Sequence, residues 1–217
     1  KIIKNKKDEV LKALNGRYTK AGLFALQQAF DSYCFYQHQI EQCDKMLEEV
    51  IKRMSKGKPN QTISSHRKPI RHNRPDIDNL GTEMMKIFDG KDATTLSGIT
   101  DYTWMQLLSE TGTDLSRWPS EKHFTSWLGL APGQHTSGKM KKNKRKSGRP
   151  KAGQIFRQIA QSLLTSKRIA LGAFGRRLGS RKGSPIAIKA IARKLAVLYW
   201  LIGLRIFVFV PKVVARI

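Results

Sequence analysis

A heptad stripe in the N-terminal third is the feature that most constrains how this chain folds. Apolar residues recur there at alternating spacings of three and four over residues 23–54, with Gln37 and Asp44 as polar interruptions. This spacing follows one face of a helix through more than four heptads. The positions that we expect to face a partner helix are Leu23, Leu26, Phe30, Tyr33, Gln37, Ile40, Leu47 and Ile51.

The stripe has two explanations. A single amphipathic helix packed on its own globular core would show the same spacing. Buried polar residues such as Gln37 and Asp44 fix the register of paired helices, so they favour a coiled coil. We therefore expect a coiled-coil arm that joins copies of the chain into a homo-oligomer, a dimer or a tetramer, and a short first helix that breaks at Gly16.

The two cysteines indicate a cellular compartment. Cys34 and Cys43 fall in the same predicted helix and are separated by roughly 13 Å of helical rise, too far for a disulfide within one chain. Neither a signal peptide nor a paired Cys and His spacing typical of zinc sites is visible. We expect a reducing cytoplasm, with the protein associated with the nucleoid, and no metal or cofactor bound by this chain.

Composition along the chain divides it into three segments. Residues 55–74 are rich in Lys, Ser, Asn, Pro and His without apolar periodicity, which is typical of a linker. The predicted segments are the short helix and arm (residues 1–58), a linker or arm-end loop (59–75) and a compact helical domain (76–217). Helical patterns in that domain cover residues 75–90, 100–110, 119–128, 152–166 and 186–202. The fold class is therefore mainly α, with residues 206–210 as the one stretch that resembles a strand.

Charge is distributed very unevenly. No acidic residue follows Glu121, and 22 of the 41 lysines and arginines lie after it, so the last 96 residues carry +22 of the total +25. A folded half with charge of a single sign is typical of a protein that binds a polyanion. Nucleic acid is the expected partner.

A membrane role is not expected. The segment from Leu195 to Val210 is very apolar, but Arg205 interrupts it. Its longest uncharged run is well short of the roughly 18 residues that span a bilayer. A buried core helix explains the segment better.

Two features of the C-terminal domain suggest contacts with nucleic acid. Gly98 and Thr100 lie in a turn between helical patterns, where a helix N-terminus can hold a phosphate, as in a helix-hairpin-helix motif. Ser137 is followed by Gly138 and a lysine-rich loop, so its hydroxyl could approach a phosphodiester whose growing charge the loop would neutralise. Local sequence alone equally fits a flexible, solvated turn. Besides Gly98 and Thr100, the residues expected to contact nucleic acid are Lys139, Lys141, Lys142, Lys144, Arg145, Lys146, Arg149, Lys151, Arg157, Arg193 and Lys194.

Several blocks, in the right order, resemble a known family. Residues 23–30, with Tyr33, residues 35–37, 39–40 and 43–44, are similar to the coiled-coil arm of DEDD insertion-sequence transposases, the bridge-RNA-guided recombinases. Residues 96–99, 110–124, 126–132, 137–139, 160–163, 171–174 and 192–196 resemble the transposase domain that follows that arm. The resemblance covers nearly the whole chain from Leu23 to Tyr199.

The resemblance implies a function. In that family an N-terminal RNase H-like domain binds divalent metal, expected to be Mg²⁺, through four carboxylates, and a serine of the C-terminal domain forms a transient phosphoserine link to DNA. The family's Ser-Gly motif falls on Ser137 and Gly138, which implies that Ser137 is the nucleophile and that structured guide RNA and DNA are partners. The residues before the arm contain no credible set of four carboxylates, so we expect the metal domain to be absent and this chain alone to be inactive.

Three departures from the family pattern are visible. The family's Gly-x-Gly turn reads Gly98-Ile-Thr100 here, the segment after Ser137 has one glycine where two are common, and the tail from Leu201 is unusually apolar. Two other functions stay open: a basic module that binds nucleic acid and oligomerises without catalysis, and a scaffold built on the arm.

Overall fold

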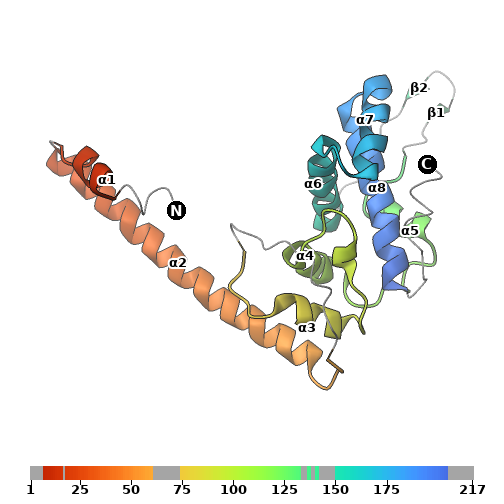
Figure 1. Ribbon diagram of the computed structural model, residues 1–217, viewed down its shortest axis with the longest axis horizontal. Coiled ribbons are helices and arrows are strands. Elements are labelled where there is room, and N and C mark those ends of the chain that lie inside the picture. The colour runs from red at the N-terminus through yellow and green to blue at the C-terminus, as the bar shows by residue number, and fades with distance from the viewer. Residues whose placement is uncertain are drawn as a thin grey trace. The chain divides into compact units, whose positions relative to one another are not determined.

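The computed structural model describes residues 7–16, 18–60, 74–132, 136–137, 140–141 and 150–204. Helices dominate, as the sequence predicts (Figure 1). The N-terminal helices are α1 (Lys7–Ala13) and α2 (Lys20–Ser55). They are followed by α3 (Leu80–Ile87), the short 3₁₀ helix η2 (Ala93–Thr95), α4 (Asp101–Thr111), α5 (Glu121–Trp127), α6 (Lys151–Thr165), α7 (Ala170–Lys182) and α8 (Ser184–Gly203).

The chain divides into two compact units at Leu47 and Glu48. The first unit contains α1 and most of α2. The apolar stripe on α2 is solvent-exposed there: Leu26, Phe30 and Tyr33 are 62%, 58% and 60% accessible. This unit therefore has no core of its own among its described residues, and the stripe is available to a partner.

The division lies inside α2, earlier than the predicted arm end at residue 58, because the last turns of α2 pack within the second unit. Ile51 is buried at 3% accessibility, and the Ser55 hydroxyl donates a hydrogen bond to the carboxylate of Glu83 on α3. Lys58 Nζ donates to the carbonyl of Ile87 at 2.7 Å. Ile51, predicted to face a partner helix, instead belongs to the hydrophobic core of its own chain.

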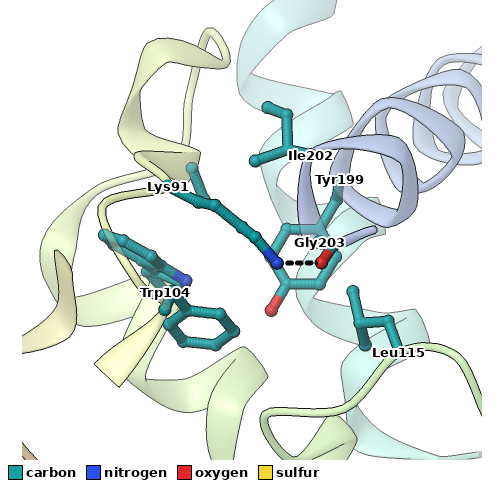
Figure 2. A pocket seen from close by; sticks show the side chains of 8 residues that line it. Lys91, Trp104, Leu115, Tyr199, Ile202 and Gly203 are labelled. Carbon is teal, nitrogen blue, oxygen red and sulfur yellow. Dashed lines mark hydrogen bonds between the residues drawn. The ribbon is translucent and has the colours of Figure 1, made fainter. Parts of the chain in front are cut away.

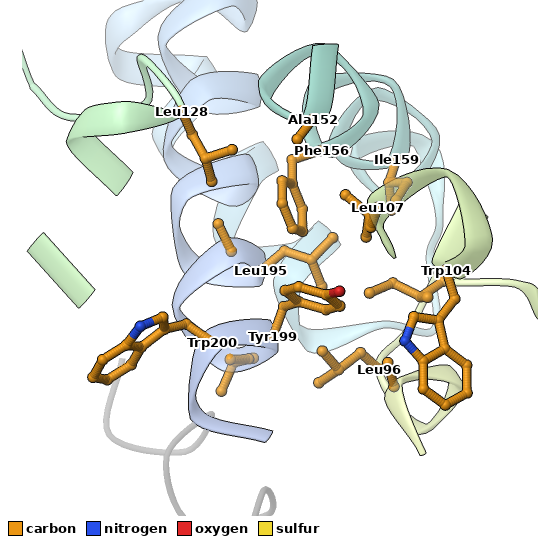
Figure 3. Close-up of a cluster of buried hydrophobic side chains, with 14 of the residues drawn as sticks. Leu96, Trp104, Leu107, Leu128, Ala152, Phe156, Ile159, Leu195, Tyr199 and Trp200 are labelled. Carbon is orange, nitrogen blue, oxygen red and sulfur yellow. The ribbon is translucent and has the colours of Figure 1, made fainter. Parts of the chain in front are cut away.

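Helix α8 is the central element of the second unit. It packs against α5, α6 and α7, and α6 also contacts α4 and α7 (Figure 1). Phe156 from α6 and Tyr199 from α8 meet with ring centroids 5.7 Å apart (Figure 3). The ring of Phe124 from α5 lies 6.4 Å from that of Tyr199. These aromatic side chains, each at 2% accessibility or less, contribute to the stability of this unit through their burial.

Helix α7 has no counterpart among the helices predicted from apolar periodicity. Three glycines, Gly172, Gly175 and Gly179, lie on it, and glycine is a poor helix former. Packing explains two of them: a Cβ at Gly172 would overlap the carbonyl oxygens of Leu163 and Ser166, and one at Gly175 would overlap the Ile191 side chain. The glycines let α7 approach α6 and α8 closely, and that contact outweighs their low propensity.

Two other details differ from the prediction. Helix α3 begins at Leu80, five residues after the expected start at Pro75, because Asn79 adopts a left-handed conformation with φ of 51° that a continuing helix excludes. Residues Thr136–Ser137 (β1) and Met140–Lys141 (β2) form a short antiparallel pair that the sequence did not reveal. The strand considered for residues 206–210 lies outside the described residues.

The described ranges contain no helix with both the length and the apolarity needed to cross a bilayer. Cys34 and Cys43 are both exposed free thiols on α2, in agreement with the predicted absence of a disulfide between them.

A small apolar cavity of about 10 Å³ lies where α8 meets the segment before α4 (Figure 2). Lys91 crosses it and donates a hydrogen bond from Nζ to the carbonyl of Gly203, so it satisfies an otherwise open carbonyl at the end of α8. The hydroxyl of Tyr199, which also lines the cavity, is buried without a hydrogen-bond partner in the described part of the chain. The nearby Thr111 hydroxyl donates instead to the carbonyl of Leu107 at 2.8 Å.

Tyr199 gives the fold a predictable response to alkali. Burial raises the pKa of Tyr199 to about 12, against a smaller opposing effect of the Thr111 hydroxyl. The unfolded phenol ionises near pH 10, so between about pH 10 and 12 the unfolded state loses its proton first and the folded state is destabilised. Between pH 9 and pH 11 the wild type should therefore lose about 1 kcal/mol more unfolding free energy than Tyr199→Phe.

Denaturant unfolding at both pH values measures this difference. Tyr33→Phe, which alters an exposed side chain on α2, is the matched control and should follow the wild type. Parallel stability losses in the wild type and Tyr199→Phe would show that the phenol is accessible to water.

Candidate nucleic-acid interface

Several cations of the acid-free half lie on three packed helices. Helix α6 carries Lys151 and Arg157, α7 ends with Arg181 and Lys182, and α8 carries Lys189, Arg193 and Lys194. Lys151, Arg181 and Lys182 are exposed, whereas Arg157, Lys189, Arg193 and Lys194 are half-buried. The half-buried cations therefore lie partly against the protein, whereas the exposed ones are accessible to a polyanion.

Ser137 lies at the end of β1. Its backbone pairs with that of Met140, and Thr136 pairs with Lys141, so the chain reverses direction directly after the serine. The side chains of Ser137 and Lys141 lie outside the described part of the structure. So do six predicted contact residues: Lys139, Lys142, Lys144, Arg145, Lys146 and Arg149.

The turn before α4 has a clear structural role. Gly98 has φ of +90°, and a Cβ there would lie 2.6 Å from Ile159 Cγ2, so glycine suits both the turn and its contact with α6. Thr100 caps α4: its Oγ1 accepts from the Thr103 amide at 3.2 Å, and its own amide donates to Thr103 Oγ1 at 2.8 Å. Asp101 adds a negative charge in the first turn of α4, which disfavours a phosphate at that helix end.

Two of the predicted contact residues also make contacts within the protein. Arg157 Nη2 donates to the carbonyl of Gly129 at 3.1 Å, which fixes the guanidinium beside the end of α5. Lys194 Nζ lies 4.0 Å from the centre of the Phe174 ring, a cation–π contact, and burial lowers the pKa of Lys194. Arg157 retains further donors for a ligand, whereas Lys194 is engaged mainly with α7.

A second serine lies near a potential base. Ser120, the residue before α5, has its hydroxyl 2.8 Å from Nδ1 of His123, and both form part of the exposed surface. A serine paired with histidine is a common arrangement for an activated nucleophile. It is equally a local contact at a helix start, so Ser120 is the natural comparison for Ser137 in mutagenesis.

Sequence reasoning missed an open groove between α6 and the start of α8. It has a volume of about 500 Å³ and is lined by Gln154, Arg157, Gln158, Gln161, Pro185, Ile188 and Lys189. Arg157 is the one predicted contact residue among them. The recurrence of glutamine on the face of α6 opposite its apolar stripe is the sequence signal that points to this groove.

The described residues include no cluster of three or more His, Cys, Asp or Glu that could hold a metal ion.

Comparison with known proteins gives one match. Residues 91–174 match the model of a family described as "Transposase IS116/IS110/IS902 family". Comparisons with curated proteins and with solved structures gave no match. The matched residues run from Lys91 through α4, α5, the β1–β2 pair and α6 into α7. The match supports an insertion-sequence transposase, and hence a transposase or recombinase function with DNA as a partner.

Proposed function

We propose that this chain contributes DNA strand cleavage and exchange to an RNA-guided insertion-sequence transposase, with Ser137 as the nucleophile. The match over residues 91–174 carries the proposal, because it includes Ser137 and the basic loop that follows it. Residues 122–174 of this segment belong to the acid-free half of the chain, whose charge suits a phosphate backbone. Sequence resemblance to bridge-RNA-guided recombinases is the basis for including a structured guide RNA.

In the proposed reaction the energy of the broken phosphodiester bond is retained in the bond between the serine and the phosphate. The oxygen of the Ser137 hydroxyl attacks a backbone phosphorus, an Oγ–P bond forms, and the bond from phosphorus to the 3′ oxygen breaks. The serine proton leaves to a base, and the departing 3′ oxygen takes up a proton. A 3′ hydroxyl of another strand then attacks the phosphoserine, which joins the strands and releases the serine.

Cations near the serine would stabilise the negative charge on the oxygens around the five-coordinate phosphorus in this reaction. The basic residues between Lys139 and Lys151 are suited to this role by their number and their proximity in sequence. A divalent metal, expected to be Mg²⁺, would assist the leaving oxygen when bound by the four carboxylates of an RNase H-like domain. We infer that this domain is supplied from outside residues 1–217, and we expect the reaction to take place in the cytoplasm, at the nucleoid.

The arm on α2 is proposed to join copies of the chain. Its exposed seam contains large apolar side chains, including Leu23 and Ile40 at 49% and 52% accessibility, that recur with heptad spacing. A contiguous apolar stripe of this length is rarely left in water by a soluble protein. Pairing of arms buries the stripe and brings several nucleophiles to one DNA assembly.

Oligomerisation should disappear when the seam is made polar. Leu26→Ser combined with Ile40→Ser is expected to convert oligomers into monomers, because each substitution removes apolar burial at two or more symmetry-related positions. Gln28→Ser combined with Gln42→Ser alters the other side of α2 and should leave the oligomer intact. Light scattering measures the mass of each; a monomeric wild type, or oligomers unaffected by the seam substitutions, would contradict the arm's role.

A trapping experiment tests the proposed chemistry. The substrate is DNA carrying an end of the mobile element, with sulfur replacing the bridging 3′ oxygen at the cleaved phosphate, and the enzyme is the complete transposase. Attack by serine expels a 3′ thiolate that re-attacks phosphorus poorly, so the protein stays linked to the 5′ phosphate of the downstream strand. Fragmentation of the linked peptide should place the DNA on Ser137.

Two results would contradict this mechanism. A protein linked to the 3′ phosphate of the upstream fragment would show the opposite polarity of cleavage. A link to Ser120 would assign another nucleophile. Tight binding of the same DNA without any covalent product would instead favour a module that binds nucleic acid without catalysis.

A further inference from the structure

The groove between α6 and α8 combines neutral amides with fixed positive charge. Gln154, Gln158 and Gln161 are spaced by four and three residues, so their side chains share one exposed face of α6. Arg157 lies between them and is held by the carbonyl of Gly129. Lys189 lines the groove from α8.

This combination is suited to nucleic acid. A glutamine amide offers two donors and one acceptor, which matches the edge of a base, whereas arginine and lysine match phosphate. The seven described residues that line the groove include no acid, so none of them repels a phosphate. Pro185 and Ile188 add an apolar wall against which the face of a base or a sugar can pack.

The concave shape restricts which form of nucleic acid fits. Base edges in duplex DNA lie deep in the major groove, where a protruding helix or ribbon reaches them. The three glutamines form one wall of a groove between two helices rather than a protruding ridge, so they reach base edges best when the bases are unpaired. A volume of about 500 Å³ falls within the roughly 300–1,000 Å³ of sites that hold small molecules, which is room for a nucleotide or two.

We propose that this groove binds a short segment of single-stranded DNA, with the three glutamines on base edges and Arg157 and Lys189 on the flanking phosphates. The proposal rests on the proposed DNA function and adds a site for an unpaired strand, separate from the predicted loop around Ser137. Unpaired strands arise whenever a duplex is opened for cleavage and exchange.

Equilibrium binding to labelled oligonucleotides tests the groove on the whole chain. The probes are single-stranded DNAs of different sequence, the matching duplexes, and single-stranded RNAs of the same sequence. The triple variant Gln154→Ala, Gln158→Ala, Gln161→Ala should weaken binding of single-stranded DNA at least about tenfold and remove its sequence preference. Its binding of duplex DNA should change less than about twofold.

Matched variants separate this effect from others. Alanine is the best helix former, so the triple variant should fold, and its circular dichroism checks this. Gln28→Ala, Gln39→Ala and Gln42→Ala on α2 remove the same number of amides and should leave binding unchanged. Lys189→Ala should reduce the slope of log affinity against log salt by about 0.7 for single-stranded DNA.

The outcomes distinguish this inference from the proposed function. If the wild type binds DNA but the triple variant binds single-stranded DNA equally well, the groove is not the site while the wider function stands. The single-stranded DNA assignment would also fail if the triple variant lost affinity equally for single-stranded and duplex DNA. It would fail too if the wild type bound RNA more tightly than DNA and the triple variant lost that RNA binding. If the wild type binds no form of DNA, both the inference and the proposed function fail.

Discussion

Ser137→Ala in the complete transposase is expected to lower the yield of covalent protein–DNA product and of exchanged strands at least about a thousandfold, because the substitution removes the attacking oxygen. DNA affinity should stay within about twofold of the wild type, since one hydroxyl contributes little beside many phosphate contacts. Denaturing gels measure the covalent product, and the same labelled DNA measures affinity.

Ser120→Ala is the control for this experiment. Its hydroxyl contacts His123, so it is the serine of the described region that most resembles an activated nucleophile. It should retain full covalent product. Undiminished product in Ser137→Ala would refute the proposed nucleophile, and loss in Ser120→Ala alone would transfer the role to that residue.

Gly153→Ala is expected to destabilise the second unit by about 3 kcal/mol, at the upper end of the usual cost of overpacking. A Cβ at this position in the first turn of α6 would overlap the backbone carbonyl oxygen of Leu128, which cannot rotate away as a side chain would. Helix α6 or the end of α5 must therefore shift. Denaturant unfolding, followed by circular dichroism, measures the difference.

Gly179→Ala makes the same chemical change where there is room. A Cβ at Gly179 would lie 3.6 Å from the Cβ of Ala187, an ordinary packing distance, and alanine is the better helix former. This variant should gain about 0.5–1 kcal/mol. If both variants gain stability, α5 and α6 are not in close contact at Gly153.

The helices that could be predicted from sequence are those with a continuous apolar face. The pattern around Phe156 and Ile159 predicted α6, and the pattern around Ile191 and Leu195 predicted α8, both close to their observed limits. Helix α7 could not be predicted in this way. Gly172 and Gly175 are favourable there only because α6 and α8 lie against them, and that proximity is a property of the assembled unit rather than of local sequence.

The candidate site shows the same limit. Charge distribution alone singled out the basic half, and Arg157 among its members lines the α6–α8 groove. The groove itself was missed because its walls come from helices separated by α7 in the chain, and because glutamines on an exposed helix face are ordinary in composition. Thr100, predicted to contact nucleic acid, forms a capping box at the start of α4, a role that the sequence reasoning did not foresee.

The central position of α8 has a consequence during synthesis. Helices α5, α6 and α7 all precede α8 in the chain, yet each packs against it. Until Gly203 has left the ribosome, the surfaces of these helices that contact α8 stay unpaired. Lys91 likewise lacks the Gly203 carbonyl that accepts its hydrogen bond. The second unit can therefore complete its fold only after α8 has been synthesised. A chain truncated before α8 is expected to be aggregation-prone rather than to form a smaller folded unit.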